Sequence, residues 1–330
     1  MKKTTSGKRN KTYKTLAIIG NGFDLAHGYA TDYRSFVNAT HSESLDAFKK
    51  YCDKGKSITT WYSFEDNINQ LTQELFLQSY SEEHDYDIVI RERTRLRDVF
   101  ADIHTLLINY LLHETEKKPV IKLPSVRKYL KRKTQAISFN YTKVVAAYPS
   151  DVFYVHGSLV EEDILLGYDY REEACVAEYD DMCWSKTICR EALAFRRYLQ
   201  NELHLQPGSN EYSERIDGLK SYQHYENSGC GVDEEVESFI PHYQLVNQFV
   251  QTYRKGGDIP RIDYKKISTL VILGHGIEAD KAFLQRIIKK CSGLKKVVIF
   301  RYTGESDTSY NTKADFFKPY CKRVRSVMYR

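Results

Sequence analysis

The sequence predicts an α/β protein with a doubly wound, Rossmann-like and mostly parallel sheet that carries two mostly helical insertions. Apolar segments far apart in the chain run directly into small or polar residues, at positions 16–24, 136–142 and 270–276. Helical patterns separate these segments, as expected for parallel strands joined by crossover helices. Because ligands of such sheets bind beyond the carboxyl ends of the strands, these segments together predict one composite site.

The composition is that of an ordinary globular protein. Hydrophobic residues make up 42% of the 330 residues, and the net charge of +5 is too small to indicate nucleic acid by itself. The seven cysteines form no C-x-x-C pair and are odd in number, which argues against common zinc sites and a secreted disulfide framework. Residues 1–14 are rich in basic side chains, and the apolar run that follows them is too short for a secretion signal or a membrane span. We therefore expect a reduced, cytoplasmic protein with a disordered arm over residues 1–14.

The first half of the chain predicts one strand followed by helices. Residues 22–27 indicate a short helix that Gly28 ends, and Asp32 is typical of the cap of a second helix. A long helix is predicted over residues 85–116, because apolar side chains recur there at helical spacing. Residues 41–133 are too many for a simple crossover, so they are predicted to form a helical insertion.

The second half returns to strands after that insertion. Residues 134–166 have strand character, interrupted by a helix over residues 143–147. Residues 170–238 are polar, and only residues 186–200 indicate a helix there, so they are predicted to form a second insertion. Helices are then predicted over residues 239–253 and 279–290, and strands over residues 270–273, 297–302 and 324–329. The prediction is one Rossmann-like domain over residues 15–330 that carries both insertions.

Gly20, Asn21 and Gly22 follow the first strand directly. Glycines let the backbone approach a nucleotide closely, and the following helix offers amide groups to anionic oxygens. Asp24 in the first helical turn would repel a phosphate, and it suits ribose hydroxyls or a helix-dipole cap instead. The spacing is not that of the G-x-G-x-x-G fingerprint of dehydrogenases. A nucleotide site and a purely structural turn both stay open for this stretch.

Two polar side chains follow neighbouring strands. Asn140 has an amide that can hold a sugar hydroxyl or a water molecule, or that can cap the next helix. His156 has an imidazole that titrates near neutrality, as a general base requires, although a histidine at a strand end is often structural. Because parallel strand ends meet at one edge of a sheet, the sequence favours a catalytic pair.

His275 and Asp280 flank the turn after a later strand. Asp280 is either the cap of the following helix or a ligand-binding residue. Ser158 lacks a G-x-S-x-G elbow, which argues against a serine hydrolase. The predicted catalytic residues are Asn140 and His156, and the predicted nucleotide-binding residues are Gly20, Asn21, Gly22, Phe23, Asp24, Gly157, Gly274, His275 and Asp280.

The motifs at these strand ends occur in an order that resembles the AbiH family of bacteriophage abortive-infection proteins. They lie at residues 19–28, 61–65, 139–142, 154–158 and 273–280. The likeness covers most of the chain, apart from the N-terminal arm and the second insertion. It implies a role in bacterial defence against phage.

A more distant likeness is to SIR2-like NAD-binding proteins, which include NAD-hydrolysing members used in phage defence. It implies a SIR2-like core with NAD or a related nucleotide as the substrate, an NAD glycohydrolase activity and no metal ion. Carried over to this chain, Gly20 and Gly22 face the phosphates, Asn140 positions the nicotinamide ribose or a water molecule, and His156 acts as the base.

The chain departs from the SIR2-like pattern at two positions. Asp24 stands where a small hydroxyl residue is usual, and Thr142 stands where Asp is common. The alternative functions are a nucleotide-binding sensor or assembly module without catalysis, and a nucleic-acid-processing toxin. A phage-derived trigger and a second copy of the chain stay open as partners, whereas nucleic acid and membranes are not expected.

Overall fold

The structure is a computed structural model, and it describes a defined part of the chain. The described residues are 12–52, 63–65, 67, 70, 86–159, 163–166, 186–227, 237–254, 262–303 and 305–330. The chain divides into two compact units, formed by residues 1–31, 114–160 and 259–330 and by residues 32–113 and 161–258. We call them the sheet unit and the helical unit, and each is described by itself.

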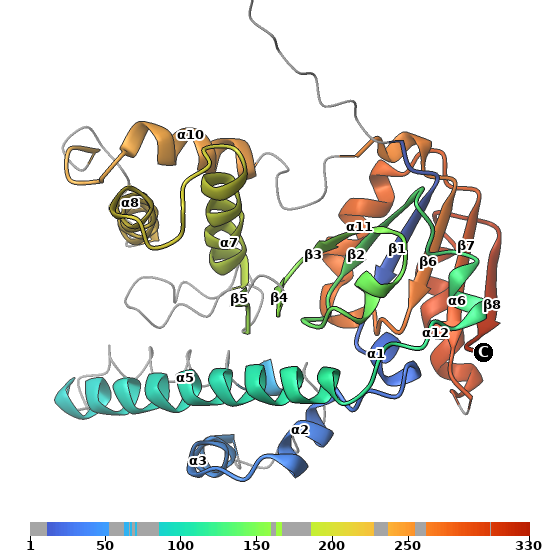
Figure 1. The fold of residues 1–330 in the computed structure, drawn as a ribbon, viewed down its shortest axis with the longest axis horizontal. Helices are drawn as coiled ribbons and strands as arrows, with labels where there is room; N and C mark the ends of the chain where they lie inside the picture. Colours follow the sequence, from blue (N-terminus) through green and yellow to red (C-terminus); the bar gives the residue numbers. More distant parts are fainter. Residues whose placement is uncertain are drawn as a thin grey trace, which may run out of the picture. The chain divides into compact units, whose positions relative to one another are not determined.

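A six-stranded parallel sheet forms the centre of the sheet unit (Figure 1). Its strands lie in the spatial order β3-β2-β1-β6-β7-β8, and every neighbouring pair is parallel. Since the chain runs outward from β1 on one side and from β6 on the other, these two strands form the switch point of a doubly wound sheet. The predicted fold class is therefore confirmed. The strands are β1 (Thr15–Ile19), β2 (Thr134–Ser138), β3 (Asp151–Tyr154), β6 (Thr269–Leu273), β7 (Lys296–Arg301) and β8 (Val324–Met328).

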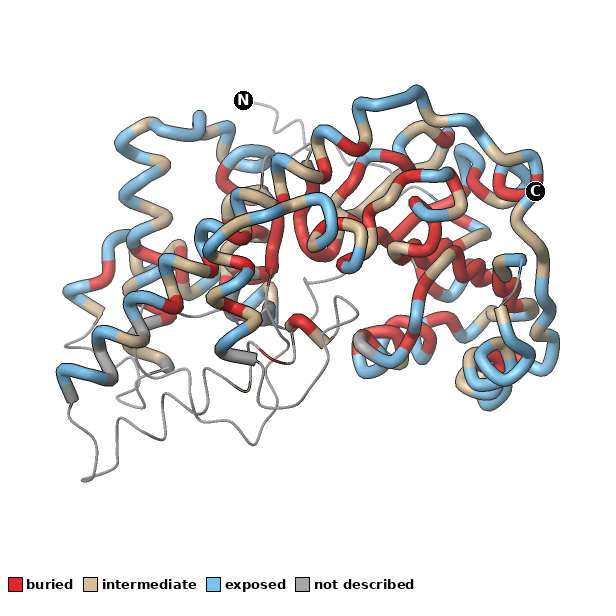
Figure 2. The backbone as a smooth tube through the Cα atoms, turned by 90° about the horizontal axis from the view of Figure 1, so that it is seen from below, coloured by how far each residue is buried: buried red, intermediate tan, exposed pale blue. Residues whose placement is uncertain are grey.

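The central strands of the sheet are buried on both faces. Leu16 and Ile18 of β1 belong to the core beneath α11 (Lys281–Lys290) and α12 (Asp307–Phe317). Ala17 and Ile19 belong to the opposite core, with α1 (Gly22–Ala26), α6 (Pro124–Arg127) and the 3-10 helix η1 (Val144–Ala147). A strand covered on both faces needs apolar residues at nearly every position, which is why the strand segments are readable from the sequence. The tube coloured by burial shows where buried, intermediate and exposed residues lie along the chain (Figure 2).

The segment between β1 and β2 is mostly helical. Gly28, with a φ of +78°, follows α1 as predicted, and the Asp32 carboxylate accepts the Ser35 N–H at 3.0 Å to cap the next helix. The ring of Phe64 packs against rings from three helices of the helical unit. They are α2 (Tyr33–Ala39), α3 (Glu43–Cys52), which the sequence did not reveal, and α5 (Tyr86–Glu116), which confirms the long helix.

The boundary of the first predicted insertion differs from that of the helical unit. Residues 114–133 belong to the sheet unit, where Val126 and Leu130 enter the core on one face of the sheet. The helical unit begins at residue 32 and takes its second segment from residues 161–258.

The segment between β3 and β6 contributes further helices to the helical unit. Phe195, Leu219 and Val246 form part of one apolar cluster of three helices. The 18-residue helix α8 was not predicted, because its mostly polar sequence has almost no apolar face. No helix in the described part of the chain has the length and apolarity needed to cross a bilayer. Of the elements between β3 and β6, the helical unit contains β5 (Asp163–Ile164), α7 (Lys186–Asn201), α8 (Asn210–Asn227) and α10 (Tyr243–Arg254), whereas β4 (Gly157–Ser158) and η2 (Tyr264–Lys266) belong to the sheet unit.

The helix predicted over residues 239–253 begins later than expected. Residues 239–242 form a turn in which His242 has a φ of +55°, and α10 starts at Tyr243. Pro241 cannot donate a backbone hydrogen bond, which favours a turn at this point over a continuous helix.

The turn after β1 is docked onto the loop after β6 by direct backbone contact. The Gly20 N–H donates to the Leu273 carbonyl at 2.9 Å, and the Gly22 N–H donates to the Gly274 carbonyl at 3.0 Å. Gly274 has a φ of +68°, and a Cβ atom there would lie 2.0 Å from the backbone nitrogen of Phe23. Only glycine fits this position, because both the backbone angle and the space exclude a side chain.

We expect Gly274→Ala to lower the free energy of unfolding by roughly 2 to 4 kcal/mol, because the methyl group would strain the backbone and overlap Phe23. Gly276→Ala is the matched control, since a Cβ atom there would have no neighbour within 4 Å. Chemical denaturation of both variants measures the difference. Equal stabilities would contradict a tight docking of the two loops.

Candidate functional site

The carboxyl ends of β1, β2, β3 and β6 bring predicted site residues together within the sheet unit. Asp24, Asn140 and His156 follow β1, β2 and β3, and His275 and Asp280 both follow β6; each of the five is at most 9% exposed. Polar side chains are seldom buried this deeply unless they hold one another or a ligand. This edge of the sheet is therefore the candidate site.

Asp280 lies between two histidines. Its Oδ2 atom is 3.2 Å from Nε2 of His275, and its Oδ1 atom is 3.8 Å from Nε2 of His156. Asp280 ends the short 3-10 helix η3 (Glu278–Asp280) and occupies the N-cap position of α11, but its carboxylate makes no cap hydrogen bond. The Asp280 carboxylate therefore does not cap α11, and it lies near the two histidines instead.

The loop that carries His275 fixes the imidazole in one form. The N–H of Ile277 donates to Nδ1 of His275 at 2.9 Å, so Nδ1 is an acceptor. The hydrogen-bond pattern therefore places the proton of the neutral ring on Nε2, which faces Asp280. Ile277 has a φ of +75°, a strained angle for a β-branched residue. Such strain persists only where the surrounding structure enforces it, and it is common at functional sites.

The ring of Phe139 packs against both histidines. Its centroid lies 5.5 Å from that of His156 and 4.5 Å from that of His275, with both pairs edge-to-face. Phe139 follows β2 directly, so the same loop supplies this apolar contact and Asn140. An apolar wall strengthens the electrostatic interactions of the imidazoles beside it.

Asn140 is held in place by its backbone. The Asn140 N–H donates to Oγ of the buried Ser138 at 3.2 Å. Neither Oδ1 nor Nδ2 of the Asn140 side chain has a hydrogen-bond partner, although both atoms are buried. Leaving a buried amide unpaired costs about 1 to 3 kcal/mol. The Asn140 side chain therefore does not cap the next helix, and it is available to a ligand or an ordered water molecule.

Asp24 is buried at the start of α1. The Thr142 hydroxyl donates to its Oδ2 atom at 2.6 Å, whereas its Oδ1 atom has no hydrogen-bond partner. Burial raises the pKa of the Asp24 carboxyl to about 7, and Thr142 and the nearby Asn140 amide lower it in part. The Asn140 amide lies near enough to the Asp24 carboxyl to lower its pKa, but the side chains of Asn140 and Asp24 form no hydrogen bond of normal geometry. Asp24 therefore changes its charge near neutral pH.

Two tyrosines at the same edge of the sheet were missed by the sequence analysis. Burial raises the pKa values of Tyr302, after β7, and Tyr329, after β8, and the charge of Asp24 raises them further. A Cβ atom on Gly22 would overlap the Tyr302 hydroxyl, so Gly22 makes room for this side chain. The available signal was their place as the last residues of the predicted strands 297–302 and 324–329.

The amide groups of the turn after β1 are committed within the protein. The N–H groups of Phe23 and Asp24 donate to the carbonyls of Gly20 and Asn21, and that of Gly22 donates to the loop after β6. The Asn21 side chain accepts a hydrogen bond from Thr31 at 2.6 Å. The glycines of this turn therefore serve close packing, and a ligand at this edge would meet side chains instead of these amides.

The other predicted positions are placed as follows. Gly157 follows β3 with a φ of +73°, and it turns the chain after His156. Trp61, part of one family-like motif, lies outside the described residues. Within the described part of the chain, no group of three or more His, Cys, Asp or Glu side chains could hold a metal ion.

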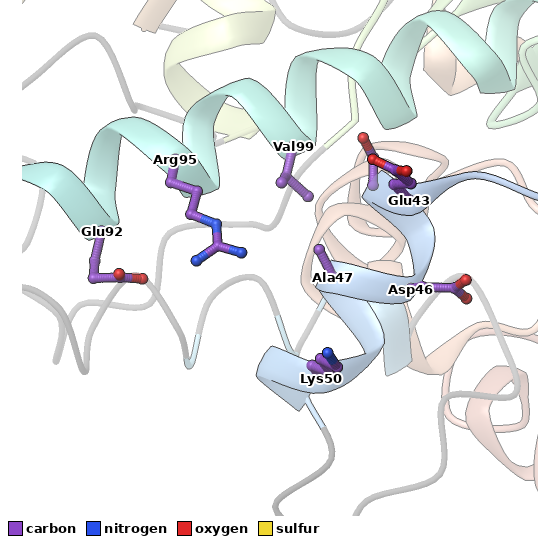
Figure 3. A pocket seen from close by; sticks show the side chains of 8 residues that line it. Glu43, Asp46, Ala47, Lys50, Glu92, Arg95 and Val99 are labelled. Atoms are coloured by element: carbon purple, nitrogen blue, oxygen red, sulfur yellow. The ribbon is translucent and has the colours of Figure 1, made fainter.

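The helical unit has a surface hollow of about 670 Å³ between α3 and α5 (Figure 3). Acidic and basic side chains are mixed in its lining, and none of the predicted site residues is among them. We place the candidate site at the strand ends, because buried polar side chains converge there. The hollow is lined by Glu43, Ser44, Asp46, Ala47, Lys50, Glu92, Arg95 and Val99.

Comparison with known proteins identifies one family. The family model described as "Bacteriophage abortive infection AbiH" matches residues 16–302, a region that contains all the strand ends described above. No curated protein and no solved structure matches the chain.

We expect Asp24→Asn to be more stable than the unaltered protein at pH 8, with a difference that shrinks toward pH 4. The pKa of Asp24 is raised from 3.8 to about 7 in the folded state. The folded protein thus holds this proton more tightly, and stability falls as the pH rises from about 4 to about 7. A neutral amide avoids this loss, which is at most about 4 kcal/mol.

Denaturant unfolding of both proteins across this pH range measures the effect. If Asp24→Asn were less stable at pH 8, the carboxylate would be favoured in its ionised form, and the assignment of its protonation state would be wrong.

Proposed function

The chain belongs to the AbiH family of bacteriophage abortive infection proteins, and we propose that it acts in this defence by hydrolysing the glycosidic bond of NAD or a related nucleotide. The observation that carries the proposal is the convergence of Asn140 and His156, both buried, at the strand ends of a doubly wound sheet. In this fold class, the crevice next to the switch point is where nucleotides bind.

The unpaired polar atoms of the site support a ligand with hydroxyl groups. The buried Oδ1 of Asp24 and the amide of Asn140 lack hydrogen-bond partners. Native proteins leave few such atoms, and those that they do leave call for a ligand or an ordered water molecule. A ribose supplies hydroxyls that can both donate to the carboxylate and pair with the amide.

The reaction needs few chemical groups. When the bond between nicotinamide and C1′ of the ribose breaks, its electron pair goes to the nicotinamide, which leaves as a neutral molecule. The ribose becomes oxocarbenium-like, and a water molecule attacks C1′. In our proposal, Asn140 holds the water or a ribose hydroxyl, and His156 accepts the proton that the water loses. The products are ADP-ribose, nicotinamide and a proton.

Asp24 and Thr142 support the likeness to SIR2-like proteins, although both depart from that pattern. Asp24 stands where a hydroxyl residue is usual, Thr142 stands where Asp is common, and here the Thr142 hydroxyl donates to Asp24 at 2.6 Å. The exchange keeps one hydroxyl and one carboxylate at these two positions. We propose that this pair shapes the ribose end of the site.

We propose a different way of binding the pyrophosphate of the nucleotide from the one that the sequence suggested. Because the N–H groups of residues 22–24 are bonded within the protein, they are not offered to phosphate oxygens. We propose that Gly20 and Gly22 form the floor of the site and that side chains hold the nucleotide.

The first test is NAD consumption by the purified protein, with and without lysate from phage-infected cells, and with nicotinamide measured by chromatography. We expect Asn140→Ala and His156→Ala each to reduce the rate at least about 100-fold, because each removes a group used in the chemical step. His113→Ala, at an exposed position on α5, is the control and should keep the parent rate.

The outcomes separate the candidate functions. Hydrolysis at the parent rate in both site variants would overturn the assignment of Asn140 and His156. A nucleotide that co-purifies uncleaved, without turnover in either condition, would favour a binding module. Salt-sensitive binding of nucleic acid, again without turnover, would favour a nucleic-acid-processing toxin.

A further inference from the structure

We propose that Asp280, held by His275, is a positioning residue that orients His156 and stabilises its protonated form, and not a residue that binds the nucleotide. This inference rests on the proposed function, in which His156 is the base. It assigns His275 and Asp280 a different task from the one that the sequence suggested.

His275 and His156 share the carboxylate of Asp280. Asp280 directs one oxygen to each imidazole, at 3.2 Å from His275 and 3.8 Å from His156. The side chains of all three residues are 11% exposed or less. A carboxylate at such a depth remains charged only when partners stabilise it.

The hydrogen bonding of its ring excludes His275 as the base. Its Nδ1 atom accepts the Ile277 N–H, and a proton added there would break that hydrogen bond. Its Nε2 atom carries the proton of the neutral ring and lies 3.2 Å from Oδ2 of Asp280. His275 therefore has no free site for a proton from water, and its role is to fix one oxygen of Asp280.

The Asp280 carboxylate acts on His156 through its negative charge. The His156 imidazole faces, among other groups, Asp280 at the start of α11 and the Phe139 ring from the loop after β2, and His275 lies beyond Asp280. The negative charge near Nε2 stabilises the ring after it takes up a proton, most strongly in an environment with little water. With Nε2 turned toward Asp280, Nδ1 is the atom that accepts the proton from water. A base that a third group orients in this way is a common arrangement in enzymes.

The strained backbone at Ile277 is independent support. This residue donates the hydrogen bond that fixes His275, and its carbonyl accepts the Asp280 N–H at 3.1 Å. Its φ of +75° is unfavourable for a β-branched side chain. The loop thus keeps a strained conformation at a residue that is hydrogen-bonded to both His275 and Asp280.

The kinetic test compares Asp280→Asn with Glu278→Gln, a control at an exposed acidic residue of the same turn. In Asp280→Asn we expect kcat for NAD to fall at least about tenfold while KM changes little, because only the transition state loses stabilisation. The acidic limb of the pH–rate profile should move to lower pH, since the anion that favours protonated His156 is gone. Glu278→Gln should match the unaltered protein. A raised KM at unchanged kcat would place Asp280 on the nucleotide and overturn the inference.

Nitrogen-15 NMR of labelled histidines tests the same inference without any turnover. We expect the neutral ring of His275 in the unaltered protein to carry its proton on Nε2, and His156 to titrate at lower pH in Asp280→Asn. A proton on Nδ1 of His275, or an unmoved His156 titration, would overturn the inference even if NAD is hydrolysed. The expected NMR result with no hydrolysis would overturn only the proposed function.

Discussion

The docking of the turn after β1 onto the loop after β6 is the constraint on which the site depends. Two backbone hydrogen bonds, from Gly20 to Leu273 and from Gly22 to Gly274, join loops that are about 250 residues apart in the chain. The contact is so close that Gly274 admits no side chain. It continues the pairing of β1 with β6 beyond the strands, and it turns the switch point of the sheet into a rigid floor.

This constraint explains why the site is built from side chains. Many nucleotide-binding sheets present the amides at the start of the first helix to phosphate groups. Here the same amides pair within the protein, and the polar groups at this edge include the buried side chains of Asp24, Asn140 and the cluster around Asp280. One part, Asp24 with Thr142, suits hydroxyl groups, and the other, His156 with Asp280 and His275, suits proton transfer. A glycosidic bond cleaved by water requires both kinds of group.

The sequence was sufficient to predict the sheet and the strand ends at which the candidate site lies, for physical reasons. Strands buried on both faces need continuous apolar runs, and polar residues that follow such runs must meet at one edge. The polar helix α8 gives no such pattern. A glycine in a sequence does not show which part of the protein packs against it. Gly22 was therefore interpreted as making room for phosphate, whereas in the structure it makes room for Tyr302. Nothing in the sequence marks the strain at Ile277, because an apolar residue there is also expected in an ordinary core. The cap and site interpretations of Asp280 differ only in where its carboxylate points.

The most direct test of the account is a crystal structure with an NAD analogue whose nicotinamide ribose has carbon in place of the ring oxygen, because this compound cannot form an oxocarbenium ion. The account predicts that C1′ of that ribose lies beside Asn140 and His156, with its hydroxyls toward Asp24 and the nucleotide against the floor formed by Gly20 and Gly22. An analogue bound in the hollow between α3 and α5, or an unchanged and empty strand-end site at saturating concentration, would contradict the central claim.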